Sequence, residues 1–354
     1  MRATVVIPTF DHGPTLERAV PSALNQTVEA VEVFVVGDGV PDATRTIMAR
    51  LTAADPRVRF FDNPKGPGNG EIHRAAALQE ATGEIVAYLA DDDLWMPEHL
   101  EFLGALLEDA DFAHTYPIRI EPDGSIGDWT VDLSRRWYIQ AMLGGTNFVP
   151  LACGGHTLQL YRRLPHGWRT RPRGTPSDLY MWQQILAVPG VRVASGARPT
   201  VLHFPSSLRR NWPMRRRLEE LDDWTARMDH PGWREDVLAG ALARSWQTAT
   251  SAWEGIQDHR RALEGFEEAA AALRGQQRDL LDQIDRLRGD RDEERRSLED
   301  QLSALRDQFQ ARERELAAIT STRTWRWRNR LLRVPLVRRL ARRPGPGRSR
   351  PGGA

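Results

Sequence analysis

Short runs rich in β-branched residues alternate with helix-like segments through the first 110 residues of this 354-residue chain. When a strand leads through a helix into another strand at this spacing, the crossover is right-handed and the strands form a parallel sheet. We therefore predict an α/β fold with a mostly parallel sheet and helices on both faces. The expected strands are Thr4–Thr9, Val31–Gly37, Val58–Asp62 and Glu84–Leu89, and the expected helices are Leu16–Gln26, Thr44–Ala53 and Glu71–Ala81.

The sequence changes character after residue 110. Residues 111–233 are rich in Trp, Gly and Pro, and Pro122–Gly124 predicts a hairpin turn. Residues 234–319 follow a helical pattern with one narrow apolar seam, and the step from Leu287 to Leu298, a heptad plus four, is typical of a coiled-coil stutter. Because so narrow a seam needs a partner helix, we expect a homo-oligomer. The seam comprises Leu263, Phe266, Ala270, Leu273, Leu280, Ile284, Leu287, Leu298, Leu302, Leu305, Phe309, Leu316 and Ile319.

Small polar or acidic residues stand at the end of each expected strand. Thr9 ends the first strand, Asp38 and Asp62 stand at the ends of the next two, and Asp91–Asp93 follow the fourth. Ligands of an open parallel sheet bind outside the carboxyl ends of its strands, so these side chains should share one site. An acidic edge repels phosphate unless a divalent cation lies between them, and Mg²⁺ and Mn²⁺ bind carboxylate and phosphate oxygens together. The strand ends therefore predict a metal–diphosphate site.

Several motifs occur in an order and spacing that resemble the family 2 glycosyltransferases of the GT-A fold. The resemblance covers residues 3–205 and implies an α/β GT-A domain with a nucleotide-sugar donor and a divalent ion, Mn²⁺ or Mg²⁺. The motifs are Val5–Phe10, Val35–Gly39, Arg74 ahead of Ala81–Glu84, and Tyr88–Glu98.

The same resemblance implies roles for individual residues. It makes Asp178 the general base that removes the proton of the acceptor hydroxyl. His156 follows two glycines that would make a flexible loop, and it is expected on the acceptor side. Asp178 as a helix cap and His203 as a core histidine are the structural alternatives. The nucleotide-binding residues implied are Pro8, Thr9, Asp38, Arg74 and Asp91, and the metal ligands implied are Asp92, Asp93 and His203.

The expected organisation combines this resemblance, over residues 3–205, with the apolar seam and the composition of the residues that follow. Residues 1–110 bind the nucleotide sugar, residues 111–233 bind the acceptor, residues 234–319 form a helical linker and coiled coil, and residues 320–354 form a basic amphipathic segment with a disordered tail. The expected reaction is a metal-dependent, inverting transfer of a sugar from a nucleotide-diphosphate donor to a hydroxyl. The expected acceptor is a saccharide or a lipid-linked molecule used in bacterial cell-surface polysaccharide or glycoconjugate assembly.

Two other functions fit parts of the sequence. A sugar-1-phosphate nucleotidyltransferase has a related sheet, but it needs a Gly-rich basic loop after the first strand, and Asp11–Pro14 contains no Arg or Lys. A catalytically idle scaffold would act through its coiled coil and basic tail. Gly37 and Ser177, which stand where many family members have carboxylates, favour this second alternative.

The C-terminal segment carries the strongest charge bias. Residues 320–354 contain eleven Arg and no acidic residue. Arg mixed with Trp and Leu over residues 324–343 is typical of a helix that lies on an anionic membrane surface. A protein partner or a solvated charge run is the alternative, and nucleic acid is disfavoured because no nucleic-acid-binding fold accompanies the charge. With no signal-peptide pattern and no apolar run long enough to span a bilayer, we expect a cytoplasmic protein, peripheral at the inner face of the membrane.

Overall fold

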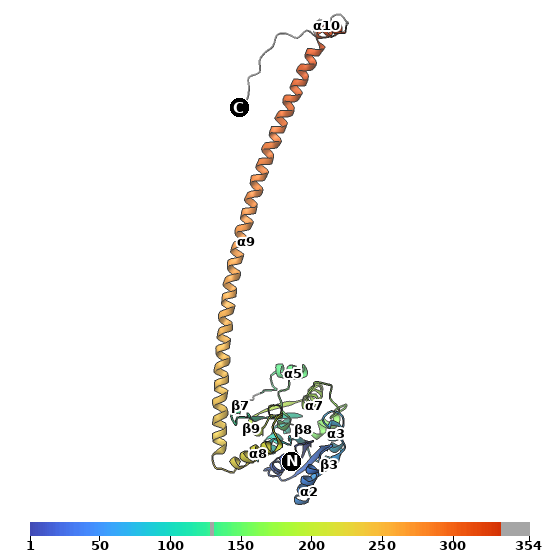
Figure 1. The fold of residues 1–354 in the computed structure, drawn as a ribbon, viewed down its shortest axis with the longest axis vertical. Coiled ribbons are helices and arrows are strands. Elements are labelled where there is room, and N and C mark those ends of the chain that lie inside the picture. Colours follow the sequence, from blue (N-terminus) through green and yellow to red (C-terminus); the bar gives the residue numbers. More distant parts are fainter. Residues whose placement is uncertain (128–130, 334–354) are drawn as a thin grey trace. The chain divides into compact units, whose positions relative to one another are not determined.

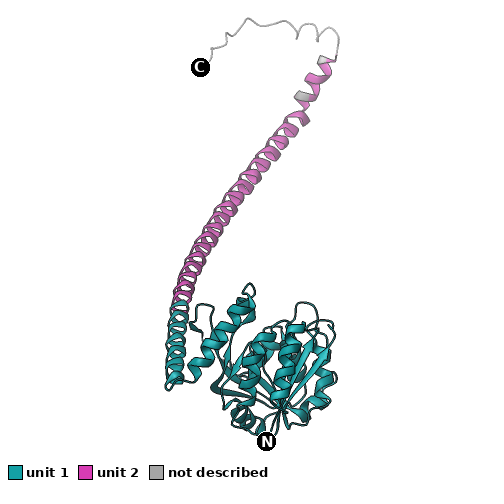
Figure 2. Ribbon diagram, turned by 60° about the horizontal axis from the view of Figure 1, so that its bottom comes forward, with its two compact units in different colours: residues 1–255 teal, residues 256–354 magenta. Residues whose placement is uncertain are grey.

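A computed structural model describes residues 1–127 and 131–333 of the chain (Figure 1). The chain divides into two compact units, residues 1–255 and residues 256–354 (Figure 2). The first unit contains the sheet, and the second contains most of one long helix. Residues 334–343 of the predicted membrane-surface segment, and the predicted disordered tail, lie outside the described residues.

The first unit is built on one sheet with the strand order β3-β2-β1-β4-β8-β6-β9-β5, and β7 pairs with β6. The first four strands of the chain are parallel, so that Val5 of β1 lies between Val33 of β2 and Ala87 of β4. The strands are β1 (Ala3–Thr9), β2 (Val31–Asp38), β3 (Val58–Asn63), β4 (Ile85–Tyr88), β5 (Leu94–Trp95), β6 (Phe112–Ile120), β7 (Ile126–Gly127), β8 (Gly154–Thr157) and β9 (Val193–His203).

The predicted α/β fold class is confirmed, and the sheet is mixed rather than mostly parallel. β8 runs antiparallel to both β4 and β6, and the short turn η2 (Leu151–Cys153) leads directly into it. Gly154 and Gly155 are poor strand formers, so the sequence pattern does not predict this strand. The close packing admits no larger residue, since a Cβ on Gly154 would lie 2.7 Å from the Trp182 ring.

Helices cover the sheet on both faces. Val5, Val6 and Ile7 are consecutive in β1 and all fully buried, which requires cover on each side. The sequence predicts that Pro21 kinks or starts the first helix, but this helix begins at Leu16 and continues past the proline. The helices are α1 (Leu16–Leu24), α2 (Asp42–Ala54), α3 (Glu71–Leu78), α4 (His99–Asp109), α5 (Arg136–Leu143), α6 (Leu158–Arg163), α7 (Ser177–Leu186) and α8 (Met214–Met228), with the 3₁₀ turns η1 (Gly13–Thr15) and η3 (Ser206–Leu208).

The bounds predicted for the first four strands and the first three helices agree with the observed bounds to within three residues at each end. The hairpin predicted at Pro122–Gly124 is confirmed, because it joins the antiparallel strands β6 and β7, and Gly124 has a φ of 81°. Such a positive φ is readily adopted by glycine alone, which explains its place in the turn.

The predicted coiled-coil segment forms a single helix, α9 (Trp233–Ser321), which is followed by α10 (Arg323–Leu332). Apart from Ala270, the side chains of the apolar seam are exposed, with Leu273 at 65% and Leu280 at 58% of their full surface. The predicted helix is confirmed by α9. Its association with a partner helix stays a prediction. No helix in residues 1–127 and 131–333 combines the length and the apolar character needed to cross a membrane.

Candidate active site

A cavity of about 890 Å³ lies at the carboxyl ends of β1 and β2 and beside the segment that follows β4. These strands are parallel, so their ends share one edge of the sheet. Asp62 at the end of β3 was expected there too, but it is not part of the lining, and its carboxylate accepts a hydrogen bond from Arg45 at 2.8 Å. The predicted site residues that line the cavity are Pro8, Thr9, Asp38, Arg74, Asp91, Asp92 and Asp178.

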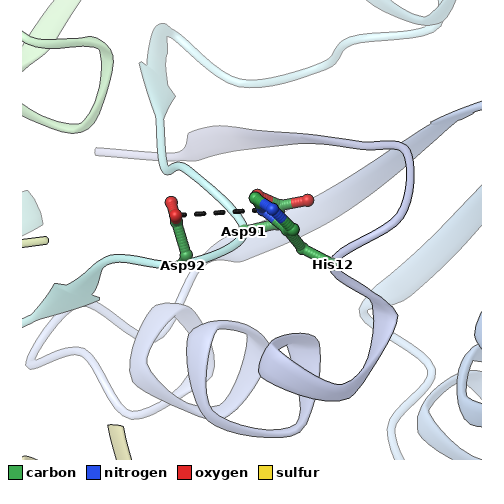
Figure 3. A group of neighbouring side chains, drawn as sticks. All are labelled: His12, Asp91 and Asp92. Carbon is green, nitrogen blue, oxygen red and sulfur yellow. Dashed lines mark hydrogen bonds and ion pairs between the residues drawn. The ribbon is translucent and has the colours of Figure 1, made fainter. Parts of the chain in front are cut away.

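His12, Asp91 and Asp92 form a compact group at the edge of this cavity (Figure 3). His12 lies in the short segment between β1 and η1, and its Nδ1 lies 3.2 Å from Asp91 Oδ1 and 3.8 Å from Asp92 Oδ2. Burial alone would lower the pKa of His12, but the hydrogen bond and charge of Asp91, with the charge of Asp92, raise the pKa to about 9. The raised pKa favours the protonated ring of His12, whose Nδ1–H then donates a hydrogen bond to Asp91.

Asp92 is the most strongly perturbed carboxylate of this group. Burial, together with the charges of Asp93 and Asp91, raises the pKa of Asp92 to about 7. Its Oδ2 accepts hydrogen bonds from the hydroxyl of Ser206 in η3 and from Arg217 Nη1 in α8, the latter at 3.2 Å. Arg217 is itself buried. A helix more than a hundred residues further along the chain thus supplies part of the positive charge that this acidic turn needs.

The donor set fits a divalent cation. In the part of the chain that the structure describes, His12, Asp91 and Asp92 are the one group of three His, Cys, Asp or Glu whose ligand atoms all lie within 4.8 Å of one another. Carboxylate oxygens are the ligands preferred by Mg²⁺ and Mn²⁺, and a neutral imidazole also binds transition metals. The sequence analysis missed His12, because a single histidine in a loop carries no recognisable motif.

Asp93 and His203, the other two predicted metal ligands, face a neighbouring cavity of about 380 Å³. Their side chains contact each other, with His203 Nδ1 3.0 Å from Asp93 Oδ2, and Asp93 also accepts a hydrogen bond from the backbone N–H of Phe204. Asp92 lines this cavity as well, so the expected trio of Asp92, Asp93 and His203 is found together in one lining. Asp92 also lines the larger cavity, which Asp93 and His203 do not. Binding of a cation by Asp93 and His203 stays a prediction.

Asp38 ends β2 and is buried against the cavity. Its carboxylate accepts hydrogen bonds from Lys65 Nζ at 2.5 Å and from the backbone N–H of Gly66 at 2.6 Å. Lys65, the single lysine of the chain, also lines the cavity. The carboxylate is thus held in place from one side by fixed partners, which orients it for a ligand in the cavity.

Arg74 and Thr9 add unsatisfied polar atoms to the lining. Arg74 is buried over the ring of Trp168, with its guanidinium carbon 4.2 Å from the ring centroid, and its Nη2 donates to the carbonyl of Asn69. Arg74 Nε and Thr9 Oγ1 are buried, and neither has a hydrogen-bond partner among the described residues. Buried polar groups are normally paired, so a ligand that hydrogen-bonds here would remove a desolvation cost.

Asp178 lies in the first turn of α7 and lines both cavities. Asn147 Nδ2 donates a hydrogen bond to its Oδ2 at 2.8 Å. Burial raises the pKa of Asp178 above that of an ordinary aspartate, and these hydrogen bonds only partly offset the rise. A carboxylate with a raised pKa is a stronger proton acceptor, and its place between two cavities suits a group that acts on two substrates.

The expectation for His156 needs correction. His156 lies in strand β8, not in a flexible loop, and it is fully buried. Its Nε2 lies 2.8 Å from the hydroxyl of Tyr88, and its ring stacks on Tyr161. It lines neither of the two cavities. The adjacent glycines admit the packed side chains of Trp182 and Leu103 and do not provide mobility.

A comparison with protein families assigns the first part of the chain. The model of glycosyl transferase family 2 matches residues 4–166. This match agrees with the resemblance that the sequence motifs show in the same part of the chain.

Curated relatives match part of the chain. Chondroitin synthase of Pasteurella multocida (strain Pm70) is 35% identical over 128 residues, which are 35% of this chain and 13% of that protein. GalNAc(5)-diNAcBac-PP-undecaprenol beta-1,3-glucosyltransferase of Campylobacter jejuni is 26% identical over 156 residues, which are 42% of this chain and 50% of that protein. The chain thus spans half or less of the length of these relatives. Among solved structures, S. aureus TarS 1-349 in complex with UDP-GlcNAc aligns with 70% of this chain and 73% of its own, with a TM-score of 0.47 and 16% identity.

The core position of His156 predicts a pH dependence of stability. Burial lowers the pKa of His156 from 6.5 to about 4, so between these values the unfolded chain binds a proton that the folded chain does not. The free energy of unfolding should therefore fall as the pH falls through this range, by up to about 1.4 kcal/mol per pH unit for this group. His156→Gln should make the dependence shallower in urea unfolding measured from pH 7 to pH 4.

The matched control for this experiment is His166→Gln, because His166 is exposed. This variant should keep the pH dependence of the wild-type chain. A dependence equally steep in His156→Gln and in the wild type would contradict the buried, uncharged state of His156.

Proposed function

We propose that this chain is a metal-dependent, inverting glycosyltransferase that moves a sugar from a nucleoside-diphosphate donor to a hydroxyl acceptor. One observation carries the proposal. In a glycosyl transferase family 2 domain, a cavity of about 890 Å³ is lined at once by Asp38, by the Asp91–Asp92 pair and by Asp178. These are the groups needed to hold a nucleotide, to hold a cation at its diphosphate and to accept a proton.

The donor would occupy the edge formed by β1, β2 and α3. Asp38 is held by Lys65 and Gly66, and it would accept hydrogen bonds from the nucleoside. Pro8 and Thr9 at the end of β1 would line the base pocket, and the unpaired Oγ1 of Thr9 would find a partner there. Arg74 would contribute its unpaired Nε and positive charge, and Asp91 would contact the ribose side.

A divalent cation, Mn²⁺ or Mg²⁺, would be held by Asp92 with Asp91 and His12, and it would neutralise charge that develops on the leaving nucleoside diphosphate. Asp92 is anchored for this task by Ser206 and Arg217. The family resemblance adds Asp93 and His203, which are close enough to each other to serve as one unit in the adjoining cavity.

Asp178 would act as the general base. The acceptor would enter from the second cavity, whose lining includes Asn147, Asp178 and Ser206. As the acceptor oxygen attacks the anomeric carbon, Asp178 takes its proton, and the bond from that carbon to the diphosphate oxygen breaks on the opposite face. Attack opposite the leaving group inverts the anomeric configuration.

The acceptor class is inferred from relatives and from the C-terminal segment. Relatives named for chondroitin, succinoglycan and undecaprenol-linked substrates favour a saccharide or lipid-linked acceptor in bacterial surface polysaccharide assembly. Residues 1–110 would form the donor half and residues 111–233 the acceptor half. The α9 seam would pair with a second copy of the chain. Residues 324–343 would hold the enzyme at the cytoplasmic surface of the membrane.

The catalytic assignment predicts two separable defects. With a panel of UDP-, GDP- and dTDP-sugars and Mn²⁺, Asp178→Asn should lower donor hydrolysis by a factor on the order of 10² to 10⁴ while nucleotide affinity is kept. Asp92→Asn should remove the Mn²⁺ dependence of nucleotide binding, measured by isothermal titration. Asp62→Asn, which changes a strand-end carboxylate outside the cavity, should leave both quantities at wild-type values.

Full hydrolysis by Asp178→Asn would place the base elsewhere, and full Mn²⁺ dependence in Asp92→Asn would exclude the proposed cation site. A wild-type chain that binds none of the nucleotides with Mn²⁺ would favour the idle scaffold.

The exposed seam of α9 predicts a change of oligomeric state on substitution. Leu273 and Leu280 lie in the seam, whereas Ala271 and Ala272 lie beside it on the same exposed helix. Leu273→Glu with Leu280→Glu should convert an oligomer into a monomer, because charges would be buried in the helix interface. Ala271→Glu with Ala272→Glu should keep the oligomer. Light scattering after size-exclusion chromatography distinguishes these states, and a monomeric wild type at tens of micromolar would refute the coiled coil.

The α10 segment predicts binding to anionic membranes. Arg326, Arg328 and Arg330 are exposed, as is Trp327. Each basic side chain contributes about 1 kcal/mol near anionic headgroups, so reversing these three to Glu should weaken vesicle binding by at least about tenfold. Flotation with phosphatidylglycerol-containing vesicles, against pure phosphatidylcholine, measures the effect. The matched control replaces Arg278, Arg286 and Arg296 of α9 with Glu, and this variant should retain vesicle binding. An equal loss of vesicle binding in both variants would contradict a membrane-binding site in α10.

A further inference from the structure

Two arginines that no motif identifies lie in the donor cavity. The segment of residues 164–176, which connects α6 to α7, contributes Arg171 and Arg173 to the lining. The acidic group of His12, Asp91 and Asp92 lines the same cavity. One cavity therefore combines a part suited to a cation with a part suited to an anion.

Lys65 and Arg74 also line the cavity, and each has partners within the protein. Lys65 is bound to Asp38 and to the carbonyls of Gly66 and Gly68. Arg74 is buried on Trp168 and donates to Asn69 through Nη2. Arg173 is exposed, and Arg171, like Arg74, has a buried Nε without a hydrogen-bond partner among residues 1–127 and 131–333.

Arg171 is positioned by a buried carboxylate. Glu71 in the first turn of α3 is fully buried, and its Oε1 lies 3.6 Å from Arg171 Nε. Glu71 also accepts hydrogen bonds from the Ser177 hydroxyl at 2.6 Å and from the backbone N–H of Asn69 at 3.0 Å. Ser177 directly precedes Asp178 in α7. One carboxylate thus fixes both Arg171 and the start of the helix that carries the proposed base.

We propose that Arg171 and Arg173 bind the diphosphate of the donor, with Glu71 as the positioning residue of Arg171. This inference rests on the proposed function, because it names the group that these arginines recognise. A guanidinium donates parallel hydrogen bonds to phosphate oxygens and remains charged at every physiological pH. The diphosphate would then be held between the cation at Asp91–Asp92 and the two guanidinium groups, and negative charge on the leaving diphosphate would meet positive charge on both sides.

The test compares nucleoside diphosphates with nucleosides. UDP, GDP and dTDP, each with Mn²⁺, are titrated into wild type, Arg171→Ala and Arg173→Ala, and the affinity for the matching nucleoside is measured by competition. Hydrogen bonds to charged groups predict that each substitution weakens diphosphate binding by a factor on the order of ten or more. Nucleoside affinity should change less than twofold. Arg171→Lys should give an intermediate loss, because lysine keeps the charge and loses the paired hydrogen bonds.

Arg169→Ala is the matched control. Arg169 belongs to the same segment, but it donates to the Tyr180 hydroxyl and is not part of the cavity lining. This variant should bind the diphosphate within twofold of wild type. Glu71→Gln should weaken diphosphate binding in the wild-type background and not in Arg171→Ala, which a purely structural role of Glu71 would not produce.

Two outcomes would overturn the inference in different ways. If wild type binds a nucleoside diphosphate and the arginine variants bind it equally well, or lose nucleoside and diphosphate affinity by the same factor, the arginines do not contact the diphosphate and the proposed function stands. If wild type binds none of the three diphosphates, the proposed function fails and this inference fails with it.

Discussion

The charge of three consecutive carboxylates, Asp91–Asp93, must be balanced inside the protein, and much of the site is arranged by this requirement. The turn after β4 buries all three, where like charges repel strongly. Each carboxylate faces a different partner. Asp91 contacts His12 from the end of β1, Asp92 contacts Arg217 from α8, and Asp93 contacts His203 from the end of β9. Three distant parts of the first unit are thereby tied to one turn.

These partners do not restore an ordinary pKa to Asp92. Burial, with the charges of Asp93 and Asp91, raises the pKa of Asp92 to about 7. A divalent cation would stabilise the charged form of this carboxylate, and arginines on the segment before α7 would supply positive charge on the other part of the cavity. Glu71 contacts both Arg171 and Ser177, so one buried side chain links an arginine of the cavity lining to the start of the helix that carries Asp178.

The sequence predicted the structural features that depend on local residue patterns and on the direction of the strands. Parallel strands follow from strand–helix alternation, and their carboxyl ends meet at one edge, so the neighbourhood of Thr9, Asp38 and Asp91–Asp92 could be expected. Contacts between single residues that are far apart in the chain could not be predicted from the sequence. His12, Arg217 and Glu71, which make such contacts, belong to no periodic pattern or motif. His156 was placed wrongly because two glycines resemble a flexible loop, whereas here they allow close packing against Trp182 and Leu103. The sequence placed Asp92, Asp93 and His203 at one site, and all three line the smaller cavity, while Asp92 also lines the larger one.

The central claim is that the Asp91–Asp92 edge binds a cation that in turn binds a diphosphate. A crystal structure of the full chain, grown with Mn²⁺ and a nucleoside diphosphate that it binds, tests this most directly through the anomalous signal of manganese. The account predicts one manganese peak between the Asp92 carboxylate and the diphosphate oxygens. A nucleotide bound in this cavity with no manganese near Asp91 and Asp92, or a nucleotide bound away from the ends of β1 and β2, would contradict it.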